Sequence, residues 1–381
     1  MSRTLTPGQI RRTNRMQIYH YIYNHRTASA HEICRDLDLS RPTVIKQLES
    51  LLEDGLIRHN GLAEKGDQAG RKANIYSIAE NLRIVVGAAV AENSVSVCLF
   101  NLYGGRICKA EEQIKIPEQG PDERYYRKVS GFIDRTVINS GIAKEQVLGA
   151  GIAVPCPVSP SGEKVVYAEP SCFAGMKSAG FSVWLQVPCT LIRNVGAAAA
   201  SEMFAAPDMD SMLYLFLGKT VGAAIVTDRR ILTGRYGHGT MIEHMQISGA
   251  SRRCRCGRYG CLETECSTDS ILLKDETLKD FTEKVIAENP EAMIRWDRYL
   301  ARLSRALETV LLLYDTQIIL GGELGEFMRD KDFAVLYRNI KEQLLYPLPE
   351  DFLCRPAVRE DAALLGAALP MIWNFLESPG S

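Results

Sequence analysis

Four residues whose side chains bind metal ions lie close together in the second half of the chain. Cys254, Cys256 and Cys261 fall within eight consecutive residues, and His244 stands ten residues before the first of them. Thiolate and imidazole are ligands that zinc prefers, and a structural site is normally tetrahedral with four protein ligands. Two glycines between the second and third cysteines let a short loop turn back on itself. The spacing predicts a Cys3His zinc site; the alternative is three unrelated thiols beside a surface histidine.

The same stretch resembles a family signature. The pattern Cys-x-Cys-Gly-x-x-Gly-Cys-x-Glu, from Cys254 to Glu263 with His244 upstream, is similar to the zinc signature of the ROK family, named for repressors, open reading frames and kinases. The resemblance implies a structural Zn²⁺. Four protein ligands leave no open position for a catalytic water, so we expect the ion to hold a loop in place. The rest of the chain must indicate which branch of the family this sequence belongs to.

Length and composition are those of a globular protein with several domains. The chain has 381 residues, more than one core usually holds, and its net charge is -1. The whole-chain charge gives no attraction to nucleic acid or membrane. No signal peptide or run of roughly 18 apolar residues is evident. Outside the cluster the cysteines are scattered, so we expect reduced thiols and a cytoplasmic location.

The first 30 residues have a local basic bias. They contain no acidic residue and five arginines: Arg3, Arg11, Arg12, Arg15 and Arg26. Apolar residues at helical spacing predict a first helix over residues 9–24. Ser29, three residues before Glu32, matches a capping box and predicts a second, short helix. Because the basic residues are concentrated here, any contact with nucleic acid is expected in this part of the chain.

A third helix is expected after Leu39. Ser40 suits an N-cap, proline is tolerated in the first turn, and apolar residues from Val44 to Leu52 repeat at a period of 3.6. Helix, short helix, turn and helix form a helix-turn-helix, whose second helix enters the DNA major groove. Five residues are predicted to face DNA from this helix and its cap: Ser40, Arg41, Thr43, Lys46 and Gln47.

Two alternating segments, residues 56–59 and 73–78, flank a stretch rich in glycine and charge. Strand, loop and strand describe a wing, and Arg71 and Lys72 stand at its return, placed for phosphate or the minor groove. Residues 1–80 are therefore predicted to be a winged helix-turn-helix. The alternative is a small helical packing module with a solvated charged face.

The remainder of the chain predicts two α/β lobes with a cleft between them. Strands are expected at 83–91, 95–102, 107–116, 147–154, 190–193, 212–217, 222–227 and 316–320, and helices at 122–139, 196–204, within 268–314 and at 361–375. This order resembles the two-lobed actin-like ATPase (ribonuclease H-like) fold of ROK proteins. The resemblance implies lobe 1 at 81–194 with the C-terminal helix 361–381, and lobe 2 at 195–360 with the zinc-binding loop.

The phosphate-binding residues of ROK kinases are altered. These kinases open with a strand ending in Asp-x-Gly-Gly-Thr, whereas this chain has Ala89 at the aspartate and Ala91 and Glu92 at the glycines. A loop with a carboxylate and bulkier side chains cannot bring its N–H groups close to a phosphate as a glycine-rich loop does. The second phosphate loop, 218–222, is half preserved. The pair Gly321-Gly322, where the family places adenine or ribose, is kept.

The catalytic base is also missing. Phosphorylation of a sugar needs a carboxylate to accept the hydroxyl proton, and the family supplies it in an Asn-Asp pair. This chain has Asn194-Val195, and valine accepts no proton. The nearest acid, Glu202, lies two helical turns further on. We therefore predict no enzymatic activity, unless the segment is misaligned and a carboxylate lies nearby.

Sugar recognition is only partly kept. Of the residues that hold hydroxyls in the family, Asn194, His244 and Glu263 remain, while Met241 stands where a glutamate is usual. Each unpaired hydroxyl against an apolar wall costs about 1–3 kcal/mol. The effector site is therefore either remodelled for a less polar ligand or vestigial. Arg193 and Glu243 are candidate replacements, or else solvated surface charges.

Three functions remain open. The first is a transcription regulator, expected to be a repressor, whose inactive ROK body senses a carbohydrate-like effector and which binds a double-stranded operator as a homodimer or higher homo-oligomer. The second is a working ATP-dependent sugar kinase with an added DNA-binding domain. The third is a zinc- or redox-responsive regulator whose three cysteines release the metal on oxidation.

Overall fold

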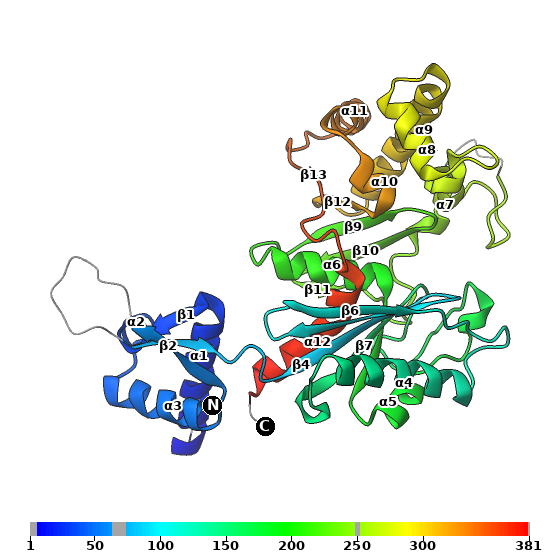
Figure 1. Cartoon of the computed structure of the whole chain (residues 1–381). Coiled ribbons are helices and arrows are strands. Elements are labelled where there is room, and N and C mark those ends of the chain that lie inside the picture. The colour runs from blue at the N-terminus through cyan, green and yellow to red at the C-terminus, as the bar shows by residue number, and fades with distance from the viewer. Residues whose placement is uncertain (1–5, 63–73, 248–251, 380–381) are drawn as a thin grey trace.

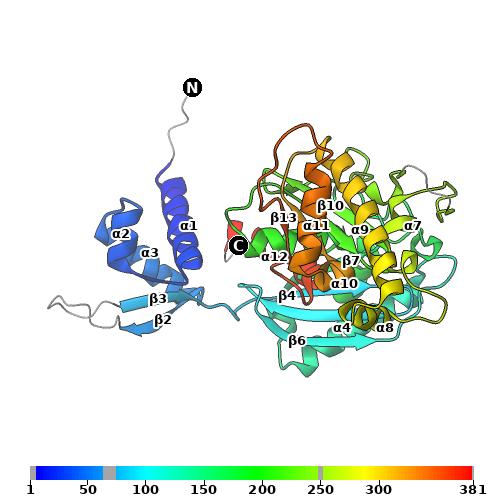
Figure 2. The ribbon, with the colours of Figure 1, turned by 90° about the horizontal axis from the view of Figure 1, so that it is seen from above.

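The computed structural model describes residues 6–62, 74–247 and 252–379. An N-terminal unit, residues 6–78, which we call the head, stands beside a larger body, residues 84–377 (Figures 1 and 2). The body contains two five-stranded sheets, and the head contains a three-stranded one. Within the described ranges, none of the helices combines the length and apolar character needed to cross a membrane.

The head is a winged helix-turn-helix, as predicted. Its elements are α1 Pro7–His25, β1 Thr27–Ser29, α2 Ala30–Asp36, α3 Arg41–Glu53, β2 Ile57–Leu62 and β3 Asn74–Ile78. The capping box of α2 is confirmed: Ser29 Oγ accepts from the Glu32 N–H at 3.3 Å, and Glu32 Oε2 accepts from the Ser29 N–H at 2.7 Å. Apolar side chains of all three helices meet in one core. This core fixes α3 against α1 and α2.

Two details of the head differ from the prediction. The first helix begins two residues earlier than expected, because Thr6 and Gln9 form a second capping box in front of Pro7. The short strand β1 was not predicted. It pairs antiparallel with β3 through Thr27–Ser29, and so the wing sheet has the order β1-β3-β2.

The two sheets of the body have the same construction. The first has the order β6-β5-β4-β7-β8 and the second β11-β10-β9-β12-β13; in each, three strands are antiparallel and two more are added in parallel. The strands are β4 Ile84–Val90, β5 Val95–Asn101, β6 Arg106–Glu112, β7 Val147–Val154, β8 Cys189–Arg193, β9 Met212–Leu217, β10 Val221–Thr227, β11 Arg230–Ile231, β12 Ile318–Gly321 and β13 Leu353–Cys354. We call each sheet with its covering helices a lobe.

Helices cover the outer faces of both sheets. In lobe 1 these are α4 Glu123–Asn139 and α5 Ser178–Leu185, and in lobe 2 α7 Leu262–Cys266, α8 Leu278–Ile286, α9 Pro290–Leu311, α10 Gly322–Phe327 and α11 Asp330–Lys341. The largest apolar core lies in lobe 2 and includes fully buried Trp296 and Phe281. Cys266 is buried in the same core.

Two helices lie between the sheets, α6 Asn194–Ala205 and α12 Ala362–Glu377 (Figure 1). Glycine permits their close approach. A β-carbon on Gly366 of α12 would collide with the Ala197 carbonyl of α6, and one on Gly151 of β7 would collide with the Ala367 carbonyl of α12. Because α6 begins at Asn194, this tight packing ties one wall of the interlobe cleft to the helix that covers lobe 1.

The head is attached to lobe 1 by packing as well as by the chain. Tyr23 of α1 stacks on Tyr103 with ring centroids 4.8 Å apart and donates a hydrogen bond to the Leu102 carbonyl at 3.0 Å. The Arg26 guanidinium lies 3.8 Å from the centroid of the same Tyr103 ring. The apolar core of the head also continues into residues of α12. The orientation of α3 therefore depends on lobe 1.

Candidate metal centre and effector cleft

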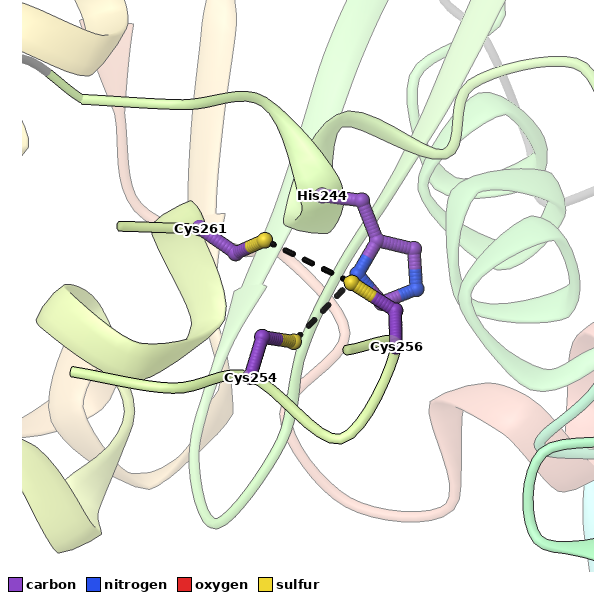
Figure 3. Close-up of side chains that lie close together, drawn as sticks. All are labelled: His244, Cys254, Cys256 and Cys261. Atoms are coloured by element: carbon purple, nitrogen blue, oxygen red, sulfur yellow. Dashed lines mark hydrogen bonds between the residues drawn. The ribbon is translucent and has the colours of Figure 1, made fainter. Parts of the chain in front are cut away.

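The structure brings the four predicted metal ligands together. The ligand atoms of His244, Cys254, Cys256 and Cys261 all lie within 4.8 Å of one another, and their side chains converge on one point (Figure 3). Cys254 Sγ lies 3.6 Å from His244 Nδ1, and Cys256 Sγ lies 3.6 Å from Cys261 Sγ. All eleven cysteines are free thiols, so disulfides do not compete for these sulfurs.

These spacings fit a tetrahedral zinc ion. Zinc–sulfur bonds of about 2.3 Å and zinc–nitrogen bonds of about 2.0–2.1 Å place two sulfurs about 3.8 Å apart and sulfur and nitrogen about 3.6 Å apart. The observed separations are close to both values. Gly257 and Gly260 have φ of +87° and +73°, which is how the loop turns back between the last two thiols. The residues present therefore fit the metal that the sequence predicts.

One thiol of the cluster ionises readily. Burial opposes ionisation of Cys256, but hydrogen bonds from the backbone and side chain of Arg258 and from the neighbouring thiols outweigh it and lower its pKa to about 7. Burial raises the pKa of Cys254 and Cys261. A bound cation would favour all three thiolates, because coordination removes the proton from a ligating thiol.

A cavity of about 210 Å³ with several charged side chains in its walls, which we call the effector cavity, opens beside the cluster. Its walls include the three predicted recognition residues, Asn194, His244 and Glu263. His244 thus belongs both to the metal cluster and to the cavity wall, and Glu263 follows two residues after the last thiol ligand. The fold therefore makes the position of two recognition side chains depend on the metal-binding loop.

An arginine of the metal-binding loop also enters this wall. Arg255 lies between two ligands, Cys254 and Cys256, and donates to Glu263 Oε1 at 2.6 Å. The hydrogen bond to Glu263 raises the pKa of Arg255. Sequence reasoning did not assign this residue. Its place between two cysteine ligands was the available signal, because a loop that aims its neighbours at one ion also fixes the direction of the residue between them.

The two candidate replacements form a buried ion pair at the edge of the effector cavity. Arg193 Nη2 lies 2.6 Å from Glu243 Oε1, and the two side chains are 14% and 6% exposed. Arg193 also donates to the Thr240 carbonyl at 3.4 Å. Arg193 Nε and Glu243 Oε2 are buried without a protein partner. The pair therefore still has one donor and one acceptor available to a ligand. Because both side chains are largely buried, these residues are not solvated surface charges.

The other half of the cleft lies on the side of Gly321-Gly322. Val195, which the sequence predicts at the position of the kinase base, is 4% exposed and packs in a core with Tyr214 and Met212. A β-carbon on Gly222 would lie 2.8 Å from Val195 Cγ1. This half contains a cavity of about 260 Å³, the nucleotide-side cavity, whose walls include Asn194, Val195, Tyr214, Phe216, Glu326 and Asp361.

The second phosphate loop is obstructed. A carboxylate oxygen of Glu323 and the ring of Phe216 lie so close to Gly218 that a β-carbon there would collide with both. A carboxylate at this point repels a phosphate, and the ring occupies space beside the backbone. Lys219 and Thr220 are exposed on the same loop.

Glu202 cannot replace the missing base. It is 2% exposed and accepts hydrogen bonds from the Ala357 and Val358 N–H groups at 2.8 and 2.9 Å. Burial raises its pKa, although these two hydrogen bonds oppose the shift. Glu202 therefore fixes the segment before α12 to α6 and is absent from the walls of all the cavities described above.

The exposed face of α3 differs from the prediction at one residue. Ser40, Arg41 and Lys46 are exposed and Thr43 is partly exposed, but Gln47 is only 3% exposed. Its assignment to the DNA-facing surface was wrong: Gln47 follows Val44 by three positions and lies on the buried stripe of the helix.

Ser40, a predicted DNA contact, has a second role in the structure, and the two predicted contacts of the wing are not described by it. The Ser40 hydroxyl accepts from the Thr43 N–H at 3.4 Å and lies 2.8 Å from the Thr43 hydroxyl, so it also caps α3. Arg71 and Lys72 lie outside the described residues.

Comparison with known proteins agrees with this architecture. Residues 90–372 match the ROK family, and residues 11–58 match a family of winged helix-turn-helix DNA-binding domains. The transcriptional dual regulator NagC of Escherichia coli K12 is 24% identical over 83% of this chain and 82% of its own length. The xylose repressor of Caldicellulosiruptor bescii is 21% identical over 69% of this chain and 66% of its own length.

Solved structures show the same fold. A ROK family transcriptional regulator, described as a homologue of the E. coli Mlc protein, covers 96% of this chain with a TM-score of 0.76 and 20% identity, and 96% of its own chain is covered. A ROK hexokinase from Thermus thermophilus covers 77% of this chain, with 99% of its own chain covered, a TM-score of 0.63 and 20% identity. With the ROK match spanning most of the chain and a winged helix-turn-helix in front of it, the protein belongs to the ROK family, among its DNA-binding transcriptional regulators.

Proposed function

We propose that the body of this regulator binds a sugar-like effector without phosphorylating it, and that effector binding alters how the head binds its operator. The observation that carries this proposal is the contrast inside one cleft. Polar side chains remain around the effector cavity, while a buried valine stands at the position of the catalytic base. A protein that keeps recognition and lacks a proton acceptor can sense a sugar but has no route to its phosphorylation.

The metal cluster is proposed to hold a structural Zn²⁺. The ion would fix the loop that presents His244, Arg255 and Glu263 to the effector cavity. Support comes from the four converging ligand atoms and from their tetrahedral spacing. With four protein ligands, the ion supplies rigidity and leaves no open site for water.

For the head, we propose DNA contacts from Ser40, Arg41, Thr43 and Lys46 at the N-terminal end of α3, with Arg71 and Lys72 added by the wing. A homodimer would present two α3 helices to two half-sites of a palindromic operator. Because Tyr23 and Arg26 pack on lobe 1, a movement of the lobes would change the spacing of these helices. The head is proposed to span residues 1–80, and the two lobes 81–194 with 361–381, and 195–360.

Salt dependence tests the DNA-binding part. A duplex selected from a random pool by the purified protein should lose on the order of 10³-fold in affinity between 50 and 200 mM salt, if about six phosphates are contacted. Lys46→Ala should weaken binding and reduce the salt slope by about 1. Lys128→Ala is the matched control, because Lys128 is an exposed lysine on α4 of the body. Equal slopes for both variants would contradict the assignment of α3.

A phosphorylation assay tests the proposed lack of enzymatic activity. Purified protein with MgATP and a panel of hexoses, pentoses and amino sugars should release no ADP above a protein-free blank. Turnover that disappears on changing Asn194 would show instead that the cleft is a working kinase site.

A further inference from the structure

A second cavity adjoins the effector cavity and has far fewer charged residues in its lining. This apolar cavity has a volume of about 270 Å³ and lies where the loop after β7 and the N-terminal end of α6 meet β10 and β11. Three residues line both cavities: Pro157, Arg193 and Val195. The two spaces are therefore neighbours that share a wall, and Val195 contributes to that wall in place of a carboxylate.

The lining of the apolar cavity is mostly hydrocarbon, with hydroxyl groups of Ser161, Thr190 and Thr233 among it. Its hydrocarbon walls are provided mainly by Leu191, Ile192, Ala223, Ala224, Ile231 and Leu232. Thr240 already donates its hydroxyl to the Ala223 carbonyl at 2.9 Å, and Ser159 Oγ accepts from the Glu163 N–H at 3.0 Å. The charged residue in the lining is Arg193, which is paired with Glu243. A hydroxylated sugar ring would leave most of its polar groups unpaired here.

The volume is sufficient for a ring-sized group. A cavity of about 150 Å³ lined by aliphatic and aromatic side chains stays dry and binds benzene in another protein. The apolar cavity is larger than that. Transfer of an apolar group from water into such a space is favourable in proportion to the area that leaves water.

We infer that the effector has two parts: a polar, sugar-like part in the effector cavity and an apolar substituent in the apolar cavity. The chemical class is a glycoside with an aryl or bulky alkyl aglycone. This inference rests on the proposed function and makes it more specific. It also accounts for Val195, which lies in the wall shared by the two cavities and presents hydrocarbon where a carboxylate would grip a hydroxyl of an unsubstituted sugar.

Gly196 provides a way to fill the apolar cavity. It lies in the first turn of α6 and lines the cavity, and an added β-carbon would meet Ile231 Cγ2 at an ordinary contact distance of 3.7 Å. Gly196→Leu should therefore project a side chain into the space that the aglycone would occupy. Gly196→Ala is the matched control, because it removes the glycine and leaves most of the cavity free.

The experiment compares phenyl and methyl β-glycosides of glucose, N-acetylglucosamine and xylose by isothermal titration calorimetry. For at least one sugar, the phenyl glycoside should bind to the zinc-loaded, full-length protein about tenfold or more tightly than the methyl glycoside. Gly196→Leu should abolish this preference and leave the affinity for the methyl glycoside within about twofold, while Gly196→Ala should keep the preference.

Three results would overturn the inference: equal affinity for both members of every pair, no binding of any glycoside, or a phenyl preference that survives in Gly196→Leu. Operator binding is measured on the same samples by gel shift. Salt-dependent DNA binding together with any of these results would reject the two-part effector and retain the DNA-binding regulator. Absence of DNA binding by folded protein would reject the proposed function itself.

Discussion

The two halves of the interlobe cleft have different chemistry. Around the effector cavity, Asn194, His244 and Glu263 keep polar atoms in the wall, and a metal-binding loop positions two of them. Around the nucleotide-side cavity, Val195 is packed into a core and Glu323 obstructs the phosphate loop. The residues proposed to bind the sugar and those expected to bind phosphate therefore lie on different elements. A protein of this fold could lose phosphate transfer and still bind a sugar.

Under the proposed function, this difference is what would let a kinase-like fold serve as a sensor. Two of the predicted recognition residues, His244 and Glu263, depend on the segment from His244 to the start of α7, whereas the loops predicted from the family resemblance to face phosphate follow β4, β9 and β12. Among the residues that the structure describes, Asn194 and Val195 alone line both cavities. Under the proposed function, valine at the second of these positions removes the base and leaves its neighbour in place.

The largest effect is expected from the metal. We expect roughly one zinc per chain in the parent protein, because the apparent binding free energy of such sites is about 10 kcal/mol or more. Cys261→Ser removes one of the four ligands and should lose this zinc. Glycoside affinity should fall on the order of 100-fold as His244 and Glu263 lose their positions. Metal analysis and calorimetry measure both quantities.

The control for this prediction is Cys354→Ser, because Cys354 is a half-buried thiol of β13 outside the cluster and serine retains its hydrogen bond to the Asp351 carbonyl. If Cys261→Ser kept its zinc, the cluster assignment would be wrong. If it lost zinc and kept full glycoside affinity, the effector cavity would not depend on the metal-binding loop.

The next largest effect is expected from the ion pair between Arg193 and Glu243. Arg193→Ala should lower the free energy of unfolding by about 3–5 kcal/mol, because it leaves a buried carboxylate without its partner. The double variant Arg193→Met with Glu243→Leu should recover most of this loss. Urea denaturation measures both. A single variant as stable as the parent would show that the pair is solvated.

Placing a carboxylate at position 195 tests whether the nucleotide-side half of the cleft can support phosphate transfer. Val195→Asp should remain without kinase activity, since Glu323 and Phe216 still obstruct the phosphate loop. The free energy of unfolding should fall by about 1–3 kcal/mol, because a polar group enters an apolar core. Coupled ADP release with MgATP and the glycoside panel measures the activity. Detectable turnover would mean that the two halves of the cleft are less different than we propose.

The smallest effect concerns Asp361, a wall of the nucleotide-side cavity. Its carboxylate is 6% exposed and lies 2.7 Å from Arg106 Nη1 and 2.6 Å from Lys109 Nζ. Burial opposes ionisation, but these two hydrogen-bonded cations outweigh it and lower the pKa of Asp361. Asp361→Asn should cost about 1 kcal/mol at pH 7, since both cations are half exposed.

The pH dependence of this cost has a definite sign. A pKa lowered by folding contributes stability that is fully present above the unfolded value of about 3.9 and is lost as the pH falls through the folded value. The difference in unfolding free energy between parent and Asp361→Asn should therefore shrink below about pH 4. A difference that stays constant down to pH 3 would show that Asp361 contributes through packing alone.

Much of the architecture could be predicted from the sequence because periodicity and caps act locally. Strands β7 and β9 have the predicted bounds, and the cap of α2 is the predicted one. The clustering of the four candidate metal ligands was predictable because they lie close together in the sequence. Gln47 was misplaced because polar character was given more weight than its helical position three residues after Val44.

Other features depend on contacts between distant segments. β1 has three residues, too few for a periodic pattern, and forms only because β3 pairs with it. The obstruction of Gly218 by Glu323 joins positions far apart in the sequence. The apolar cavity arises where strands and helices from both lobes approach one another, and so no local pattern could indicate it.

The placement of α12 has a consequence for synthesis of the protein on the ribosome. This helix covers β4 and β7 of lobe 1 and contributes to the core against which the head rests, yet the whole of lobe 2 precedes it in the sequence. A nascent chain therefore cannot complete lobe 1 until lobe 2 has been translated, and such long-range pairings form slowly. We expect newly made molecules to acquire a fixed orientation of α3 only after lobe 2 and α12 have been synthesised. Few incomplete chains would then bind the operator.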